Sequence, residues 1–256
     1  MFYLISSYLK FLRRSTNQHG VHSPFVYELV TKCFYDKTPY PEYKLLREHR
    51  KLLANDHQTI EVKDFGAGSR VFRSNHRKVA AIAKTAGIRR KQQELLFRLV
   101  KFLKPNSILE LGTSLGISTF TMAKAADEVT ITTLEGCPQT AKKAKQYLEK
   151  FKVENVRIQN SHFNSFLAED QSQYDFIYVD GNHSKTATLG IFDQLLTKVH
   201  NDAIIVFDDI YWSREMTEAW NEIVGHSEVT VSIDTFHWGV VFFRKEQVKE
   251  HFTIRV

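Results

Sequence analysis

A glycine-rich loop between two apolar runs is the feature that most constrains the fold of this chain. Ser107–Leu111 is a short apolar run, as expected for a central parallel strand. The loop Gly112–Gly116 follows it, residues 117–126 continue as a helix, and residues 129–134 form the next strand, ending at Glu135. A right-handed crossover brings the carboxyl ends of two parallel strands to one edge of the sheet. Glu135 is therefore expected beside the loop.

A second candidate loop, Asp64–Ser69, does not meet these conditions. The run before it, residues 59–63, alternates polar and apolar side chains, which is typical of a half-exposed strand. A basic helix follows, and no acidic strand end lies at the right distance. We interpret this segment as a flexible loop, with a part in a lid as the alternative.

The charges around the first loop indicate the kind of ligand. Glu110 stands at the strand end, where its carboxylate would repel a pyrophosphate but attract a ligand that carries an amino group and a sulfonium. Gly112 and Gly116 let the backbone approach a ligand closely. Glu135 can accept hydrogen bonds from both hydroxyls of a ribose. These residues favour S-adenosyl-L-methionine (SAM) over a dinucleotide.

The elements after this unit continue in a recognisable order. Apolar runs at 156–160, 174–180 and 203–209 predict three more strands, and 229–233 with 238–244 predict a final antiparallel pair. Residues 107–243 thereby resemble the class I SAM-dependent methyltransferases. The resemblance implies an α/β fold, a Rossmann-like doubly wound sheet of seven strands, mostly parallel with the last strand antiparallel. It also implies cofactor contacts at Ser114 and Phe163, the latter in the loop that commonly holds the adenine.

Two acidic motifs refine the resemblance. Asp180-Gly181-Asn182-His183 follows the fourth strand, and Asp208-Asp209 ends the fifth. They resemble those of metal-assisted O-methyltransferases of the catechol, caffeoyl-coenzyme A and macrocin types, which implies that Asp180, Asp208 and Asp209 bind a divalent cation. Oxygen ligands suit Mg²⁺ or Mn²⁺. His183, or Asp180 without a metal, would accept the proton of a substrate hydroxyl. Asn182 departs from the macrocin type, which tends to have an acid there.

Structural roles compete with these catalytic ones. Asp208 and Asp209 could end a strand in solvent and cap the next helix, and His183 could cap the helix that begins near Ser184. Tyr211 and Trp212 could wall an aromatic substrate or simply contribute to packing.

The charge of the chain divides it into two segments. Residues 1–104 hold 21 Lys and Arg against 8 Asp and Glu, a net charge of +13, whereas residues 105–256 have a net charge of −7. We expect residues 1–104 to form a basic helical arm or lid packed on the SAM-binding domain, residues 105–256. Helical patterns cover roughly 24–35, 42–54, 74–86 and 89–103, with Ser23-Pro24 as a helix start. An apolar stripe from Phe2 to Leu12 predicts one further helix.

The function expected from the sequence is methyl transfer to a hydroxyl of a small molecule, which the basic arm would allow to be anionic. Two other hypotheses stay open: an RNA methyltransferase that uses the basic arm, and a non-catalytic methyltransferase-like binding module. The apolar N-terminal stripe makes a homodimer plausible. Two cysteines cannot form a disulfide framework, and no stretch approaches the ~20 apolar residues of a transmembrane span, so a cytoplasmic protein is expected.

Overall fold

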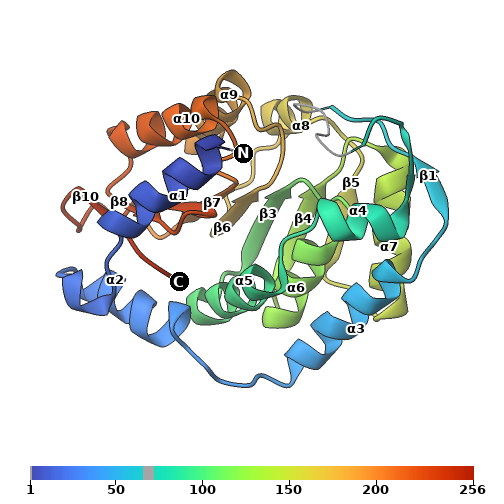
Figure 1. Ribbon diagram of the computed structural model, residues 1–256, viewed down its shortest axis with the longest axis horizontal. Helices are drawn as coiled ribbons and strands as arrows, with labels where there is room; N and C mark the ends of the chain where they lie inside the picture. Colours follow the sequence, from blue (N-terminus) through green and yellow to red (C-terminus); the bar gives the residue numbers. More distant parts are fainter. Residues whose placement is uncertain (1, 66–71) are drawn as a thin grey trace.

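An eight-stranded sheet forms the centre of the protein in this computed structural model, which describes residues 2–65 and 72–256 (Figure 1). The strand order is β10-β8-β9-β7-β6-β3-β4-β5, and β9 runs antiparallel to both of its neighbours, whereas the other pairs are parallel. The strands are β3 (Ser107–Leu111), β4 (Thr130–Leu134), β5 (Val156–Gln159), β6 (Phe176–Val179), β7 (Ile204–Asp208), β8 (Val231–Asp234), β9 (Trp238–Phe242) and β10 (Glu250–Thr253).

The Rossmann-like α/β fold and its antiparallel β8–β9 pair confirm the prediction, while the strand count differs. The sequence predicted seven strands, and the eighth is β10, which pairs in parallel with β8 at the edge of the sheet. Only Phe252 of β10 is buried. A single buried side chain gives no apolar alternation, so the strand has no pattern by which it could be recognised.

Helices cover both faces of the sheet (Figure 1). Successive strand residues point to opposite faces, and accordingly Ile108 belongs to one hydrophobic cluster and Leu109 to another. The first cluster includes side chains of the helices α2 (Pro24–Leu29), α3 (Glu42–Ala54), α4 (Val79–Thr85), α5 (Arg90–Leu103), α6 (Ile117–Ala125) and α7 (Pro138–Lys150). The second includes side chains of α1 (Phe2–Arg14), α8 (Phe163–Glu169), α9 (Lys185–Leu195) and α10 (Arg214–Gly225).

The predicted helix at 74–86 is wrong in its first part. Residues His76–Lys78 form a strand, β2, which pairs antiparallel with β1 (Thr59–Glu61), and α4 begins only at Val79. The charged His-Arg-Lys triplet has no strand pattern of its own, so it becomes a strand only through hydrogen bonds to β1. Residues 66–69 of the loop interpreted above as flexible lie outside the described residues.

The N-terminal stripe forms a helix as predicted, and it lies beside α10 (Figure 1). Phe11 is buried in the cluster on that face of the sheet. At the end of α1 the chain turns back onto the far end of the sequence, where Thr16 forms a parallel bridge with Ile254. Ser23 then caps α2 as expected, because its hydroxyl accepts a hydrogen bond from the Val26 N–H. Within the described residues, no helix combines the length and apolar character needed to cross a bilayer.

Candidate active site

A cavity of about 930 Å³ opens where β3, β6 and β7 end. In open α/β sheets, ligands bind at the carboxyl edge of the strands. Ligand pockets usually measure roughly 300–1,000 Å³, so this cavity has room for a cofactor and a second small molecule. The predicted residues that line it are Gly112, Ser114, Glu135, Phe163, Asp180, His183, Asp208 and Asp209.

Position 112 requires glycine because two loops approach each other closely there. Its φ is +112°, and a Cβ atom placed there would lie 1.9 Å from the backbone oxygen of Asp180. The loop after β6 is held against β3 in turn, because the Asp180 N–H donates to Leu111 O at 2.9 Å. Any side chain at position 112 would therefore push apart the two loops that form the floor of the cavity.

The carboxylate of Glu135 is oriented by the backbone around it. Its Oε2 accepts a hydrogen bond from the Ser114 N–H at 2.9 Å, and its Oε1 accepts one from the Cys137 N–H at 2.8 Å. Burial is the main cause that raises the pKa of Glu135, and these two bonds oppose it. Glu135 thus lies beside the glycine loop, where the sequence predicted it, and its contact with a ribose stays a prediction.

Glu110 and Gly116 lie outside the lining of the cavity. Glu110 is fully buried beneath the loop, where its Oε2 accepts hydrogen bonds from the hydroxyls of Thr119 and Thr133. Its Oε1 has no hydrogen-bond partner among the described residues. Gly116 precedes α6 with a φ of +77° and faces Ala144 of α7. Both residues therefore support the glycine loop on the side away from the cavity. Direct contact of either residue with a ligand stays a prediction.

Aromatic rings line the end of the cavity near β4 and β5. The ring of Phe163, the first residue of α8, lies close to Gly181. A Cβ atom added to Gly181 would be 2.9 Å from this ring. Phe65 contacts Gly136 in the same way and meets His162 edge to face, with ring centroids 4.5 Å apart. Flat, partly apolar surfaces of this kind suit a purine ring.

Three carboxylates meet at the other end. Asp180 follows β6, and the adjacent residues Asp208 and Asp209 end β7. Burial raises the pKa of Asp180 well above its ordinary value, and repulsion by Asp208 and Asp209 adds to it. The pKa of Asp208 rises to about 8 for the same two reasons, burial first and then Asp209. The site therefore concentrates negative charge that a proton or a cation would relieve.

The capping roles weighed for His183 and for Asp208-Asp209 are filled by serines. Ser184 caps α9, with its hydroxyl accepting from the Ala187 N–H, and Ser213 caps α10 in the same way. His183 instead lies in the cavity, with its Nε2 3.8 Å from Asp180 Oδ1 and its ring 5.5 Å from that of Trp212.

The donor chemistry of the three carboxylates suits Mg²⁺ or Mn²⁺, but their arrangement does not form a ligand set. Among the described residues, no three His, Cys, Asp or Glu side chains have positions that could hold a metal ion. Asp208 is committed to the protein, since Oδ2 accepts from Tyr178 and Oδ1 accepts from the Asp209 N–H. As described, these residues do not fit a bound cation.

Backbone strain concentrates in this cavity. Among the described residues of its lining, four that are not glycine have a positive φ: Ser114 (47°), Asn182 (52°), Asp209 (55°) and Phe236 (74°). Such conformations cost of order 1–3 kcal/mol each and persist where the surrounding structure imposes them. The most unusual is Phe236, a bulky residue, which is held between the rings of Tyr211, at 4.9 Å, and Phe11, at 5.5 Å.

The residues in the described lining that the sequence analysis did not single out include Leu4, Arg89, Phe236 and His237. Phe236 and His237 could have been found, because they join β8 to β9 at the same edge of the sheet as Asp208, which pairs in register with Trp238. Leu4 and Arg89 carry no such signal, since only the packing of α1 and α5 brings them to the cavity.

Comparison with known proteins agrees with this geometry. Residues 109–210 match the family model described as a methyltransferase domain. A curated relative, the tapetum-specific methyltransferase 1 of Arabidopsis thaliana, is 28% identical over 137 residues, which cover 51% of this chain and 58% of that protein. The match thus spans little more than half the length of that relative.

Solved structures extend the likeness to most of the chain. A methyltransferase of Podospora anserina bound to S-adenosylhomocysteine (SAH) aligns with a TM-score of 0.62 at 15% identity, covering 88% of this chain and 97% of that one. An O-methyltransferase of Bacillus cereus in complex with SAH gives 0.58 at 17% identity, covering 83% and 96%.

The chain therefore has the fold of the SAH-bound methyltransferases to which it is similar. Within it, residues 109–210 match the model of a methyltransferase domain.

Proposed function

We propose that the protein binds SAM and transfers its methyl group to a hydroxyl of a small molecule. The observation that carries this proposal is the single cavity in which the Gly112–Ser114 loop, the Glu135 carboxylate and the acidic end of β6 and β7 meet. The two ends differ in chemistry, one suited to a nucleoside and the other to a polar reacting group.

At the nucleoside end, Glu135 would accept hydrogen bonds from the ribose hydroxyls, and Phe163 would lie against the adenine. Gly112 would let the backbone approach the amino-acid part of the cofactor. Burial raises the pKa values of Glu110 and Asp180 on the same side, and a ligand that carries a sulfonium and an ammonium group would be favoured because its positive charge stabilises their ionised forms.

At the reacting end, His183 would hold the acceptor hydroxyl and accept its proton as the methyl group moves. Asp180, 3.8 Å from the imidazole, would stabilise the charge that then develops on His183. Direct transfer of this kind depends on holding the oxygen in line with the sulfonium methyl, so positioning supplies most of the acceleration. The buried aromatic wall of Tyr211 and Phe236 limits water around the reacting atoms.

Binding of a divalent cation is a separate prediction, because the three carboxylates do not form a ligand set in the positions described. The mutual repulsion of Asp180, Asp208 and Asp209 supports it, since a cation would lower the raised pKa values of Asp180 and Asp208. Methyl transfer measured after dialysis against EDTA, and again after Mg²⁺ or Mn²⁺ is restored, tests this part. Equal rates with and without a cation would remove the metal from the proposal.

The main test is binding followed by transfer. Calorimetry of the purified protein with SAH should show one site per chain; no binding would favour the non-catalytic alternative. Transfer of a labelled methyl group should then be compared between a panel of hydroxylated small molecules and total RNA, because label in RNA alone would favour the RNA hypothesis. His183→Gln should retain SAH binding and lose methyl transfer by about 100-fold or more.

A further inference from the structure

Arg89 is a cation of the cavity lining that has no role in the proposed methyl transfer. Arg89 immediately precedes α5, is exposed, and lines the cavity. No carboxylate of the described residues lies within ion-pair distance of it. Its neighbour Arg90 differs in this respect, since Arg90 Nε lies 2.8 Å from Glu94 Oε1. Two adjacent arginines thus have different environments, one facing the cavity and the other paired along its own helix.

The other two cations in the described lining differ from Arg89. Arg77 pairs with Asp64 at 3.3 Å and lies over the ring of Phe72. Lys63 lies at the nucleoside end, since its backbone N–H donates to the sulfur of Cys137, which follows the loop of Glu135. Of the two guanidinium groups in the described lining, Arg89 is therefore the one without a carboxylate partner.

Two further donors accompany Arg89. The side-chain oxygen of Gln92 accepts a hydrogen bond from the Arg89 N–H at 2.9 Å, so the group that Gln92 presents to a ligand is its NH₂. His237 lies within electrostatic range of both Arg89 and Asp209. Burial, together with Arg89, lowers the pKa of His237, which leaves a neutral imidazole able to donate one hydrogen bond.

Apolar surface lies next to these donors. Phe236 adjoins His237 in sequence and stacks on Tyr211, and Leu4 of α1 reaches the same cavity. A ligand that fits this surface has a flat apolar body with a polar group at each end. One end is the hydroxyl that reaches Asp180 and His183, and the other meets Arg89.

The charge of the cavity limits what that second polar group can be. Five carboxylates and three cations are among its described lining residues, so a doubly charged group would be repelled. A planar carboxylate with one charge suits a guanidinium fork and flat donors.

We propose that Arg89, with Gln92 and His237, binds the carboxylate of a hydroxylated aromatic acid, the acceptor in the methyl transfer. This assignment rests on the proposed function, which it extends from small molecules in general to aromatic acids. Arg89 is a specificity-determining residue here and takes no part in the chemistry.

The test uses two probes of nearly identical shape, 3,4-dihydroxybenzoate and 3,4-dihydroxybenzamide, which differ in the charge of one group. Their binding to the SAH-loaded full chain is measured by calorimetry. The wild-type protein should bind the acid at least about tenfold more tightly than the amide. Arg89→Ala should reduce this preference to less than about twofold, and Arg89→Lys should retain part of it.

Arg90→Ala is the matched control and should keep the full preference for the acid. Equal or undetectable binding of the two probes to the wild-type protein, or an unchanged preference in Arg89→Ala, would overturn the assignment. SAH affinity, measured first for every variant, separates the two proposals. Without SAH binding the proposed function fails, whereas intact SAH binding without discrimination refutes only the carboxylate subsite.

Discussion

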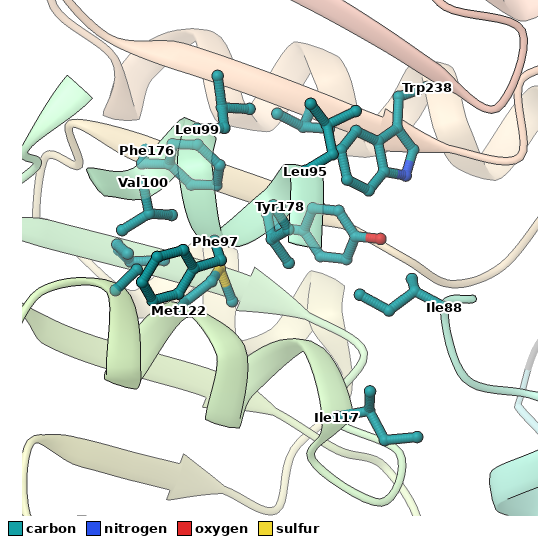
Figure 2. Packing of buried hydrophobic residues seen from close by; sticks show 14 of the residues in the cluster. Ile88, Leu95, Phe97, Leu99, Val100, Ile117, Met122, Phe176, Tyr178 and Trp238 are labelled. Carbon is teal, nitrogen blue, oxygen red and sulfur yellow. The ribbon is translucent and has the colours of Figure 1, made fainter. Parts of the chain in front are cut away.

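The Tyr178 hydroxyl donates a hydrogen bond of 3.0 Å to Asp208 Oδ2, which joins the hydrophobic core to the acidic end of the cavity. Figure 2 shows the Tyr178 ring beside Trp238 in that core, with its hydroxyl at the edge of the cluster. The other oxygen of Asp208 accepts from the Asp209 N–H, so both carboxylate oxygens are held. The position of Asp208 is therefore decided by the core under it.

Tyr178→Phe should lower the free energy of unfolding by about 1–3 kcal/mol at pH 7, because a buried acceptor then loses its donor. Chemical denaturation measures this. The control is Tyr147→Phe, which removes a hydroxyl that donates to Asp56. Asp56 still has Lys143 at 3.1 Å, so this substitution should lower the free energy of unfolding by less than about 0.5 kcal/mol. Equal losses in the two variants would mean that Asp208 does not depend on the Tyr178 hydroxyl.

Gly112→Ala should abolish detectable SAH binding, since the new Cβ atom would collide with the Asp180 backbone and separate the two loops. The chain provides its own comparison in α9, where a Cβ atom at Gly190 would meet nothing within 4 Å. Gly190→Ala should keep SAH affinity and gain roughly 0.5–1 kcal/mol of stability. If Gly112→Ala binds SAH normally, the glycine loop is not the cofactor site.

Phe236 permits a test of backbone strain. Alanine normally stabilises a fold relative to glycine, but at a φ of +74° the order should reverse, with Phe236→Gly about 1 kcal/mol more stable than Phe236→Ala. Both variants lose the same ring, so their difference reports the backbone alone. Thermal unfolding of this pair should be compared with Phe243→Gly and Phe243→Ala, at a site without positive φ, where the alanine variant should be more stable.

Acid should destabilise the protein through His49. This side chain is fully buried, with its ring stacked 4.4 Å from that of Phe120, and burial together with Arg50 lowers its pKa to about 3. The unfolded chain, with an ordinary histidine pKa of 6.5, binds the proton first. The contribution of neutral His49 to the free energy of unfolding is therefore fully present above pH 6.5. It is lost as the pH drops toward 3, and the loss is about 2 kcal/mol at pH 5.

His49→Phe should remove this part of the acid sensitivity, as seen in denaturation curves recorded between pH 8 and pH 4.5. The exposed His57→Gln variant serves as the control and should follow the wild-type curve. Parallel curves for all three proteins would show that His49 is not the responsible group.

The strands could be predicted from the sequence where their burial requires a run of apolar residues. β6 and β7 are buried on both faces, which requires an unbroken apolar run. β2 and β10 could not be predicted, since the first has no buried side chain and the second has one. Their extended conformation depends on a neighbouring strand.

The same division applies to the cavity. Glu135 follows from its distance to the glycine loop, whereas Arg89 reaches the site only through tertiary packing. The charge of the N-terminal segment was also informative only in part. Arg98 donates to the backbone oxygens of Cys33 and Phe34, and Arg50 donates to Ile88 O, so some of the surplus cations satisfy carbonyl groups inside the fold.

The bridge between Thr16 and Ile254 has a consequence for how the protein is made. Thr16 N–H donates to Thr253 O, Arg255 N–H donates to Thr16 O, and the Arg255 guanidinium reaches Leu12 O. These bonds fasten the helix that carries Leu4 into the cavity, yet they come from opposite ends of the sequence. Contacts so distant along the chain form late. During synthesis, this wall of the cavity can close only after residues 253–255 have left the ribosome.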